Sequence, residues 1–176
     1  CALVTPVENT IKVVVLQHPN EVGHSKGSLG LLAKSLSNCD VIVGESFTDN
    51  EALISVLSTY GDNVCLLFPH QHSHELSIKE SVISAKQQCI ILLDATWKKA
   101  YKMYVKSTIL HSIAHVHLPD GFVGQYHIRK TRKVNALSTL EACCYALSLL
   151  EGNNNKYQNL LKSFVKFNQI QLSFRR

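Results

Sequence analysis

Short apolar runs alternate with segments of helical periodicity along this chain, a pattern typical of a parallel α/β sheet. Runs rich in Val, Ile, Leu and Cys predict strands at 11–17, 40–44, 64–68, 89–94 and 114–118. Apolar spacings of three and four predict helices at 28–36, 48–57, 77–87, 97–106, 138–152 and 157–170. Strands that are apolar throughout suit burial on both faces. We therefore expect a mostly parallel sheet with helices on both faces.

One of these strands ends in an acid. The apolar run at 89–93 leads directly into Asp94, and Thr96 and Trp97 then open a helix. Ligands of open α/β sheets bind outside the carboxyl ends of the strands. Asp94 is therefore positioned for chemistry.

The helix that follows Asp94 is amphipathic. At 100° per residue, the arc that we expect to pack on the sheet contains Trp97, Ala100, Tyr101, Tyr104 and Val105. The opposite side is a lysine stripe formed by Lys98, Lys99, Lys102 and Lys106. Such a stripe is either a solvated charged face or a surface for a polyanion.

The charge distribution favours the polyanion. The net charge is +5, yet residues 95–140 hold eight Lys or Arg against one acid, Asp120. Positive charge confined to one segment predicts a polyanionic partner on one face of the protein.

Length and composition indicate a folded globular protein. The 176 residues fit a single domain, 1–176, with a terminal helix and tail at 157–176. No apolar run is long enough to span a membrane and no signal sequence opens the chain, so we expect a cytoplasmic protein without a membrane partner. The six cysteines include no C-x-x-C pair, which argues against a disulfide framework.

Three segments that follow strands or precede a buried helix have a distinctive composition: 68–69, 94–97 and 136–139. If they are neighbours, they enclose one crevice with two helix N-termini, which suits a ligand carboxylate. Alternatively, Thr96, Ser138 and Thr139 are only helix caps, and Ser138 with Glu141 has the spacing of a capping box. Gly-x-Gly-x-x-Gly and P-loop patterns are absent, which excludes the classical nucleotide sites that depend on them.

Several histidines and a basic segment admit two interpretations each. His70, His72 and His74 could hold a metal, but Pro69 and the lack of a nearby cysteine favour a solvated loop. His18 and His24 either line the crevice or belong to polar loops. The segment 126–133 alternates aromatic, apolar and cationic residues, which suits stacking on bases and neutralising phosphates, or else forms a solvated basic loop.

With these residues laid out, the chain resembles the DTW-domain family, whose signature here is Asp94-Ala95-Thr96-Trp97. Further matching segments, spread in the family's order over about residues 11 to 152, are 16–21, 36–38, 68–69, 126–129 and 137–142. The resemblance implies transfer of the 3-amino-3-carboxypropyl group of S-adenosylmethionine to ring nitrogen 3 of a tRNA uridine. It also implies a SPOUT-like fold with a C-terminal trefoil knot.

The resemblance further implies roles for individual residues. Asp94 would be the general base toward the uridine imide, or would orient the imide by hydrogen bonding. The residues expected to surround the cofactor are Leu67, Phe68, Pro69, Thr96, Trp97, Leu137, Ser138 and Thr139. Those expected to lie toward the tRNA are His18, Glu21, Lys26, Lys98, Lys102, Arg129, Lys130 and Arg132.

The chain departs from the family pattern in a few places. Many members carry several cysteines before the first strand, so Cys1 is expected to be the last of a zinc-binding set whose other members precede this sequence. No metal site is expected from that one ligand alone. Gly30 and His127 stand where arginine is common in relatives, which changes the expected phosphate contacts.

Two other functions remain open at this point. A SPOUT-type RNA methyltransferase would use the same cofactor and a similar basic face. A non-catalytic RNA-binding module would bind tRNA in a salt-dependent manner without the cofactor. The expected partner in each case is RNA rather than DNA, and either a monomer or a homodimer is compatible with the sequence.

Overall fold

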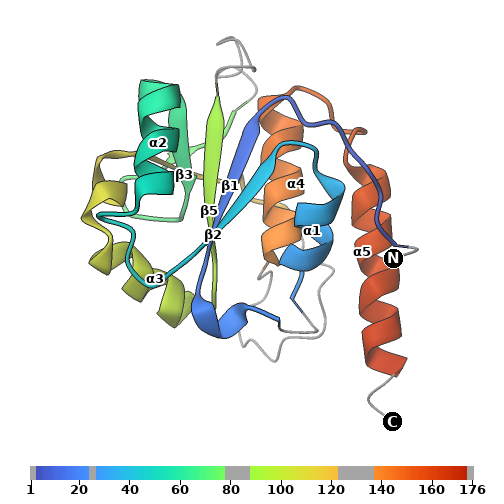
Figure 1. Ribbon diagram of the computed structural model, residues 1–176. Helices are drawn as coiled ribbons and strands as arrows, with labels where there is room; N and C mark the ends of the chain where they lie inside the picture. The colour runs from blue at the N-terminus through green and yellow to red at the C-terminus, as the bar shows by residue number, and fades with distance from the viewer. Residues whose placement is uncertain (1–2, 24–26, 78–87, 123–136, 174–176) are drawn as a thin grey trace.

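The computed structural model describes residues 3–23, 27–77, 88–122 and 137–173, and within them a parallel sheet carries helices on both faces (Figure 1). The strands are β1 (Lys12–Gln17), β2 (Cys39–Val43), β3 (Val64–Leu67), β4 (His74–Glu75), β5 (Cys89–Asp94) and β6 (Ala114–His117). Their order is β2-β1-β5-β3-β6-β4, and each neighbouring pair is parallel. All carboxyl ends therefore meet at one edge of the sheet.

The helices form two layers. On one face lie α2 (Glu51–Tyr60), α3 (Trp97–Lys106) and the 3-10 helix η5 (Thr108–Ser112), and on the other lie α1 (Leu29–Ser35), α4 (Thr139–Leu150) and α5 (Gln158–Ser173). The short 3-10 helices η1 (Pro19–Glu21) and η2 (Gly61–Asn63) occupy two of the connections. The expected α/β class with a parallel sheet is confirmed, whereas the helix expected at 77–87 falls almost entirely outside the described residues.

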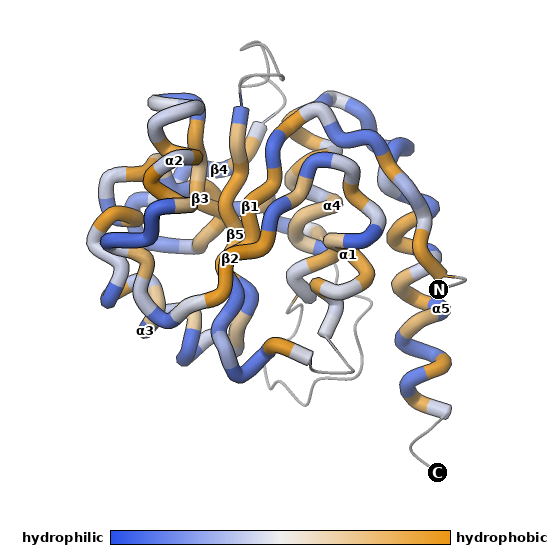
Figure 2. Tube along the Cα trace, viewed as in Figure 1, coloured by the Kyte–Doolittle hydropathy of each residue, from blue (hydrophilic) through white to orange (hydrophobic). Residues whose placement is uncertain are grey.

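Alternate residues of the central strands supply two separate cores. Val13 and Val15 of β1 pack toward α1 and α4, while Val14 and Leu16 pack toward α2 and α3. Figure 2 shows the resulting concentration of hydrophobic residues along β1 and β5. The uninterrupted apolar runs are thus explained by burial on both faces.

The sheet-facing side of α3 differs from the expected arc. Its buried residues are Ala100, Met103 and Tyr104, whereas Trp97, Tyr101 and Val105 are 49%, 60% and 50% exposed. The ring of Tyr104 stacks on Phe68 at 5.0 Å between centroids, which holds the helix in this rotation. The expected arc was therefore wrong by roughly a quarter turn, because Met103 takes a place on the sheet that the pattern assigned to Tyr101.

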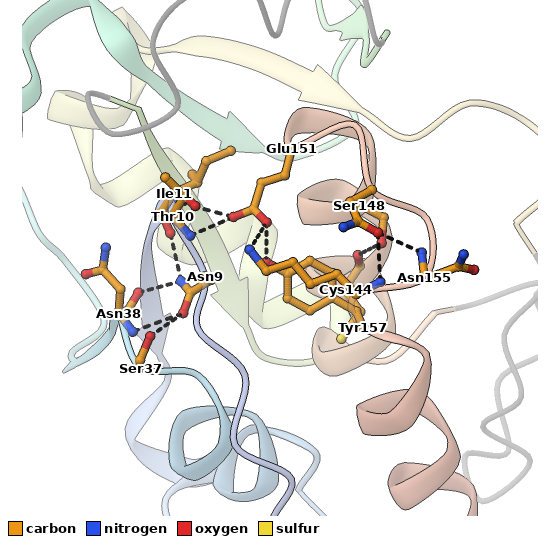
Figure 3. Close-up of polar contacts among 12 residues, drawn as sticks. Asn9, Thr10, Ile11, Ser37, Asn38, Cys144, Ser148, Glu151, Asn155 and Tyr157 are labelled. Atoms are coloured by element: carbon orange, nitrogen blue, oxygen red, sulfur yellow. Dashed lines mark hydrogen bonds and ion pairs between the residues drawn. The ribbon is translucent and has the colours of Figure 1, made fainter.

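At the edge of the sheet opposite the carboxyl ends of the strands, a polar cluster joins the start of β1 to the end of α4 (Figure 3). The Glu151 carboxylate accepts hydrogen bonds from the backbone N–H groups of Thr10 at 2.7 Å and Ile11 at 3.3 Å. It also accepts from Lys156 Nζ at 2.6 Å and from the Tyr157 hydroxyl at 2.9 Å. We call these five residues the amino-end network, since they lie where β1 begins.

The ends of α4 follow the sequence signals. Ser138 caps the helix, and Gly152 just beyond it has φ of +63°, a conformation that glycine adopts without strain. Across the described ranges, no helix combines the length and apolarity needed to cross a bilayer.

Candidate active site

A cavity of about 430 Å³ opens at the carboxyl edge of the sheet. Its walls come from the ends of β3, β5 and β6, from the first turn of α3 and from the start of α4. The volume lies in the range of about 300–1,000 Å³ that is typical of small-molecule sites. The cavity is therefore where a ligand would bind in a sheet of this kind.

Most of the expected cofactor residues border this cavity. Those lining it are Leu67, Phe68, Pro69, Trp97, Leu137, Ser138 and Thr139. Thr96 does not line it; it is exposed at the N-cap of α3 and makes no side-chain capping bond. The structure thus brings together three segments that are far apart in the sequence, and their binding of a cofactor stays a prediction.

Asp94 lies just behind the cavity wall. Its side chain belongs to a residue that is only 6% exposed, and it is absent from the cavity lining, although its neighbours Leu93 and Ala95 contribute to it. Asp94 Oδ1 accepts a hydrogen bond of 2.6 Å from the Thr139 hydroxyl, and Oδ2 accepts one of 3.0 Å from Gln17 Nε2. Because Thr139 lines the cavity, its hydroxyl connects the carboxylate to that space.

The start of α4 has the expected capping box. The Ser138 hydroxyl accepts from the Glu141 backbone N–H at 3.2 Å, and Glu141 Oε2 accepts from the Ser138 N–H at 2.8 Å. Ser138 is therefore a helix cap and also a lining residue. The positive end of the α4 dipole lies at the cavity, which favours a negatively charged ligand group there.

The residues expected to face tRNA have different environments. His18 is 6% exposed, and its Nδ1 accepts a hydrogen bond from the Asn20 N–H at 3.1 Å. Glu21 pairs with Lys99 at 3.2 Å. Of that set, the structure places Lys98 and Lys102 on an exposed surface.

The rest of the set lies outside the described residues. These are Lys26, Arg129, Lys130 and Arg132. Four residues singled out from the sequence for other reasons also lie there: Cys1, His24, Tyr126 and His127.

The lysine stripe on α3 is partly neutralised. Lys99 pairs with Glu21, and Lys106 pairs with Glu45 at 3.3 Å. The hydrogen bond from Lys106, followed by its charge, lowers the pKa of the Glu45 carboxyl. Within the part of the chain that the structure describes, Lys98 and Lys102 form no ion pair, although the charge of Lys102 also helps to lower the pKa of Glu45.

The histidine segment is only partly the expected solvated loop, since two of its three histidines are exposed but His70 is half-buried. His74 lies on β4, and the His70 ring approaches those of Tyr104 and His115 at 5.8 and 5.4 Å between centroids. Burial lowers the pKa of His115, and the nearby His70 and His111 lower it further. Among the described residues, no group of three His, Cys, Asp or Glu is arranged to hold a metal.

Two contributions to the site were missed from the sequence. The end of β6 and the loop after it add a wall formed by His117, Leu118, Pro119, Asp120, Gly121 and Phe122. That strand end was recognised, but the position of β6 beside β3 was not. Gln17 was also missed, because its contact with Asp94 depends on the parallel register that sets the two residues opposite each other.

The chain is similar in sequence to a family of known proteins. The model of the DTW domain family matches residues 1–172. The chain is 28% identical over 173 residues to tRNA-uridine aminocarboxypropyltransferase 2 of Mus musculus, which covers 96% of this chain and 57% of the relative. The protein of the same name from Drosophila melanogaster is 30% identical over 166 residues, covering 92% of this chain and 64% of the relative. The chain thus spans about three fifths of the length of these relatives, and no solved structure matches it significantly.

Proposed function

Because the chain belongs to the DTW domain family, we propose that it is a tRNA-uridine aminocarboxypropyltransferase. It would move the 3-amino-3-carboxypropyl group of S-adenosylmethionine to ring nitrogen 3 of a uridine. The names of its relatives support the type of enzyme. The observation that carries the proposal is the contact between Asp94 of the signature and Thr139, a residue that borders the cavity.

The cavity residues fit a molecule such as S-adenosylmethionine. Phe68, Pro69 and Leu118 provide apolar walls that suit a purine ring, and the start of α4 suits a carboxylate. When bound, the cofactor would supply an electrophilic carbon next to its sulfonium. The remaining task of the protein is to orient the uridine and to take up its imide proton.

Thr139 and Asp94 can carry that proton together. The Thr139 hydroxyl donates its one proton to Asp94 Oδ1, so its oxygen keeps lone pairs that can accept from the uridine N–H. As the imide proton moves to Thr139 Oγ1, the original hydroxyl proton moves to Asp94. The uridine nitrogen becomes anionic, the carboxylate becomes neutral, and the threonine is regenerated.

Gln17 would hold the other carboxylate oxygen in place. Its 3.0 Å bond to Oδ2 leaves Oδ1 directed at Thr139. In the more limited form of the proposal, Asp94 only orients the Thr139 hydroxyl so that it accepts from the imide. Either form makes Thr139 the group that touches the substrate.

Mass spectrometry of nucleosides from tRNA incubated with the protein and S-adenosylmethionine tests the activity. The proposed reaction adds about 101 Da to a uridine, whereas a methyltransferase adds about 14 Da. Calorimetry with S-adenosylmethionine alone separates both enzymes from a non-catalytic RNA-binding module, which would show no heat of cofactor binding. No mass gain with folded protein and the matching tRNA would reject the proposed function.

Substitutions at Thr139 test the proton path. Thr139→Ser keeps the hydroxyl and is expected to stay within about 10-fold of wild type. Thr139→Ala removes it and should lower kcat by about 10²-fold or more, the scale of general acid–base catalysis. Equal rates for the two variants, with equal cofactor affinity, would exclude a hydroxyl in the proton path.

We propose in addition a SPOUT-like fold with a C-terminal knot, and a cytoplasmic location. The all-parallel sheet and the meeting of Phe122 and Leu137 at one cavity support the fold, since these residues flank segment 123–136. An experimental structure that traces this segment tests the knot, and cell fractionation tests the location.

A further inference from the structure

The outer face of α3 carries two parallel rows of side chains. One row is Trp97, Tyr101 and Val105, which are 49%, 60% and 50% exposed. The other is Lys98, Lys102 and Lys106, also exposed. Residues four apart on a helix have Cβ atoms roughly 5–6 Å apart, so each row is a continuous ridge. We call the two rows together the α3 ridge surface.

Packing among the described residues does not explain why Tyr101 and Val105 of this row stay exposed. The sheet-facing side of α3 is already filled by Ala100, Met103 and Tyr104. Large apolar side chains that stay half exposed in one contiguous row are typical of an interaction site. The α3 ridge surface is therefore available for a partner.

The composition of the surface selects one kind of partner. Lys98 and Lys102 form no ion pair with an acid among the described residues, although the charge of Lys102 reaches Glu45, so the lysine row keeps positive charge for an anion. Aromatic rings beside such cations suit unpaired nucleotides, whose bases stack on the rings and whose phosphates meet the lysines. A lipid surface or an acidic peptide would match the charge but would gain less from the flat face of a ring.

The position of the surface connects it to the cavity. Trp97 lines the cavity, and Tyr101 follows one helical turn away. We propose that Tyr101 is a stacking platform for an unpaired nucleotide next to the target uridine, with Lys102 contacting its phosphate. This inference rests on the proposed function and specifies how the RNA would be held. It requires a single-stranded loop, because bases within a duplex cannot stack on a protein ring.

Binding of RNA to Tyr101 variants tests the inference. The probes are the tRNA substrate and a short uridine-containing single-stranded oligonucleotide, and the quenching of Trp97, the single tryptophan of the chain, follows binding. Tyr101→Ala should weaken the affinity by about 5- to 150-fold, the effect of losing one stacked base. Tyr101→Phe should bind RNA with wild-type affinity, whereas Tyr101→Leu should bind it more weakly. The Ala, Phe and Leu variants should all keep wild-type affinity for S-adenosylmethionine.

The contribution of Lys102 to RNA binding is measured separately, from the salt dependence of the affinity. Lys102→Gln should reduce the slope of log affinity against log salt by about 0.7, the value for one phosphate contact with a single strand. Matched controls lie on α5, where Ile170 is 44% exposed and Lys166 is also exposed. Ile170→Ala and Lys166→Gln should leave both affinity and slope unchanged.

The outcomes separate this inference from the proposed function. Wild-type RNA affinity in Tyr101→Ala, or equal binding of duplex and single-stranded probes, would overturn the inference even if uridine transfer is observed. Conversely, a loss of RNA binding that only Phe restores would support the surface even if no transfer is detected. Binding of an acidic peptide but not of RNA through Tyr101 would also overturn it.

Discussion

Two buried carboxylates lie at opposite edges of the same sheet, and they differ in how completely they are bonded. Glu151, in the amino-end network, accepts four hydrogen bonds, two from backbone N–H groups and two from side chains. Asp94, at the carboxyl edge, accepts two bonds from side chains of the described residues. A carboxylate has about four acceptor positions, so Glu151 is saturated and Asp94 is not.

The difference assigns a separate task to each edge. A saturated, buried carboxylate holds elements together and has no capacity for a ligand. An incompletely bonded carboxylate next to a cavity keeps acceptor capacity, and in the proposed function it exchanges a proton with the uridine through Thr139. Substitutions at the amino edge should therefore change stability, and those around Asp94 should change activity.

The largest expected effect comes from Asp94→Asn. The amide keeps the size of the side chain but cannot take up a proton, so kcat should fall by about 10²- to 10⁴-fold. The melting temperature should stay within a few degrees of wild type, and the uridine transfer assay measures the loss. Near-normal activity would exclude Asp94 as the base. The orienting role is tested by Asp94→Ala, because the amide oxygen of asparagine can still accept from the Thr139 hydroxyl.

Glu151→Gln is the matched substitution at the other edge. It removes the charge that Lys156 and Tyr157 bond to, and the free energy of unfolding should fall by about 2–3 kcal/mol. Urea denaturation measures this change, and kcat at a temperature where the variant is folded should be unchanged. A loss of activity in the folded variant would contradict the division between the two edges.

Tyr157→Phe removes one bond from the amino-end network and should cost about 1.5 kcal/mol at pH 8. Burial, followed by the charge of Glu151 and the bond to it, raises the pKa of the Tyr157 hydroxyl above its ordinary value of 10. Above pH 10 the unfolded chain therefore releases this proton while the folded protein retains it, so wild-type stability falls with rising pH. Above pH 10, the difference in free energy of unfolding between wild type and Tyr157→Phe should therefore shrink by up to about 1.4 kcal/mol per pH unit.

Denaturation of both proteins at pH 8 and pH 11 checks this pH dependence. If the difference in free energy of unfolding between the two proteins is the same at pH 8 and pH 11, Tyr157 titrates alike in the folded and unfolded states.

The smallest expected effect is that of Ser138→Ala, which removes the cap of α4. Loss of such a cap costs about 1 kcal/mol. Because Ser138 also lines the cavity, the affinity for S-adenosylmethionine is measured alongside stability. If stability falls but the affinity for S-adenosylmethionine does not change, Ser138 acts only as a helix cap. Its neighbour Thr139, by contrast, is proposed to contact the substrate.

The local features of the fold could be predicted from the sequence. Apolar runs located every strand except β4, whose two residues give no periodicity, and the spacing of Ser138 and Glu141 located the capping box. These features depend on neighbours in the sequence. Three of the segments that wall the cavity were also predicted, because the strand ends and helix starts that carry them can be recognised locally.

The features that were missed depend on tertiary contacts. Periodicity shows that α3 has an apolar side but not which of two adjacent arcs meets the sheet, and the stack of Tyr104 on Phe68 decides it. The Gln17 contact and the wall from the β6 loop both require the strand order, which no local pattern specifies.

The parallel pairing of β1 with β5 has a consequence for synthesis on the ribosome. Gln17 bonds to a residue 77 positions later, so β1 has emerged long before its central neighbour exists. At about 5–20 residues per second, the wait is roughly 4–15 s. During that interval the wholly apolar stretch Val13–Leu16 has only β2 beside it in the sheet, which makes the nascent protein a candidate client for chaperones. The signature acid belongs to β5, the strand that ends this exposure, so the edge that carries the candidate site and the centre of the sheet form together.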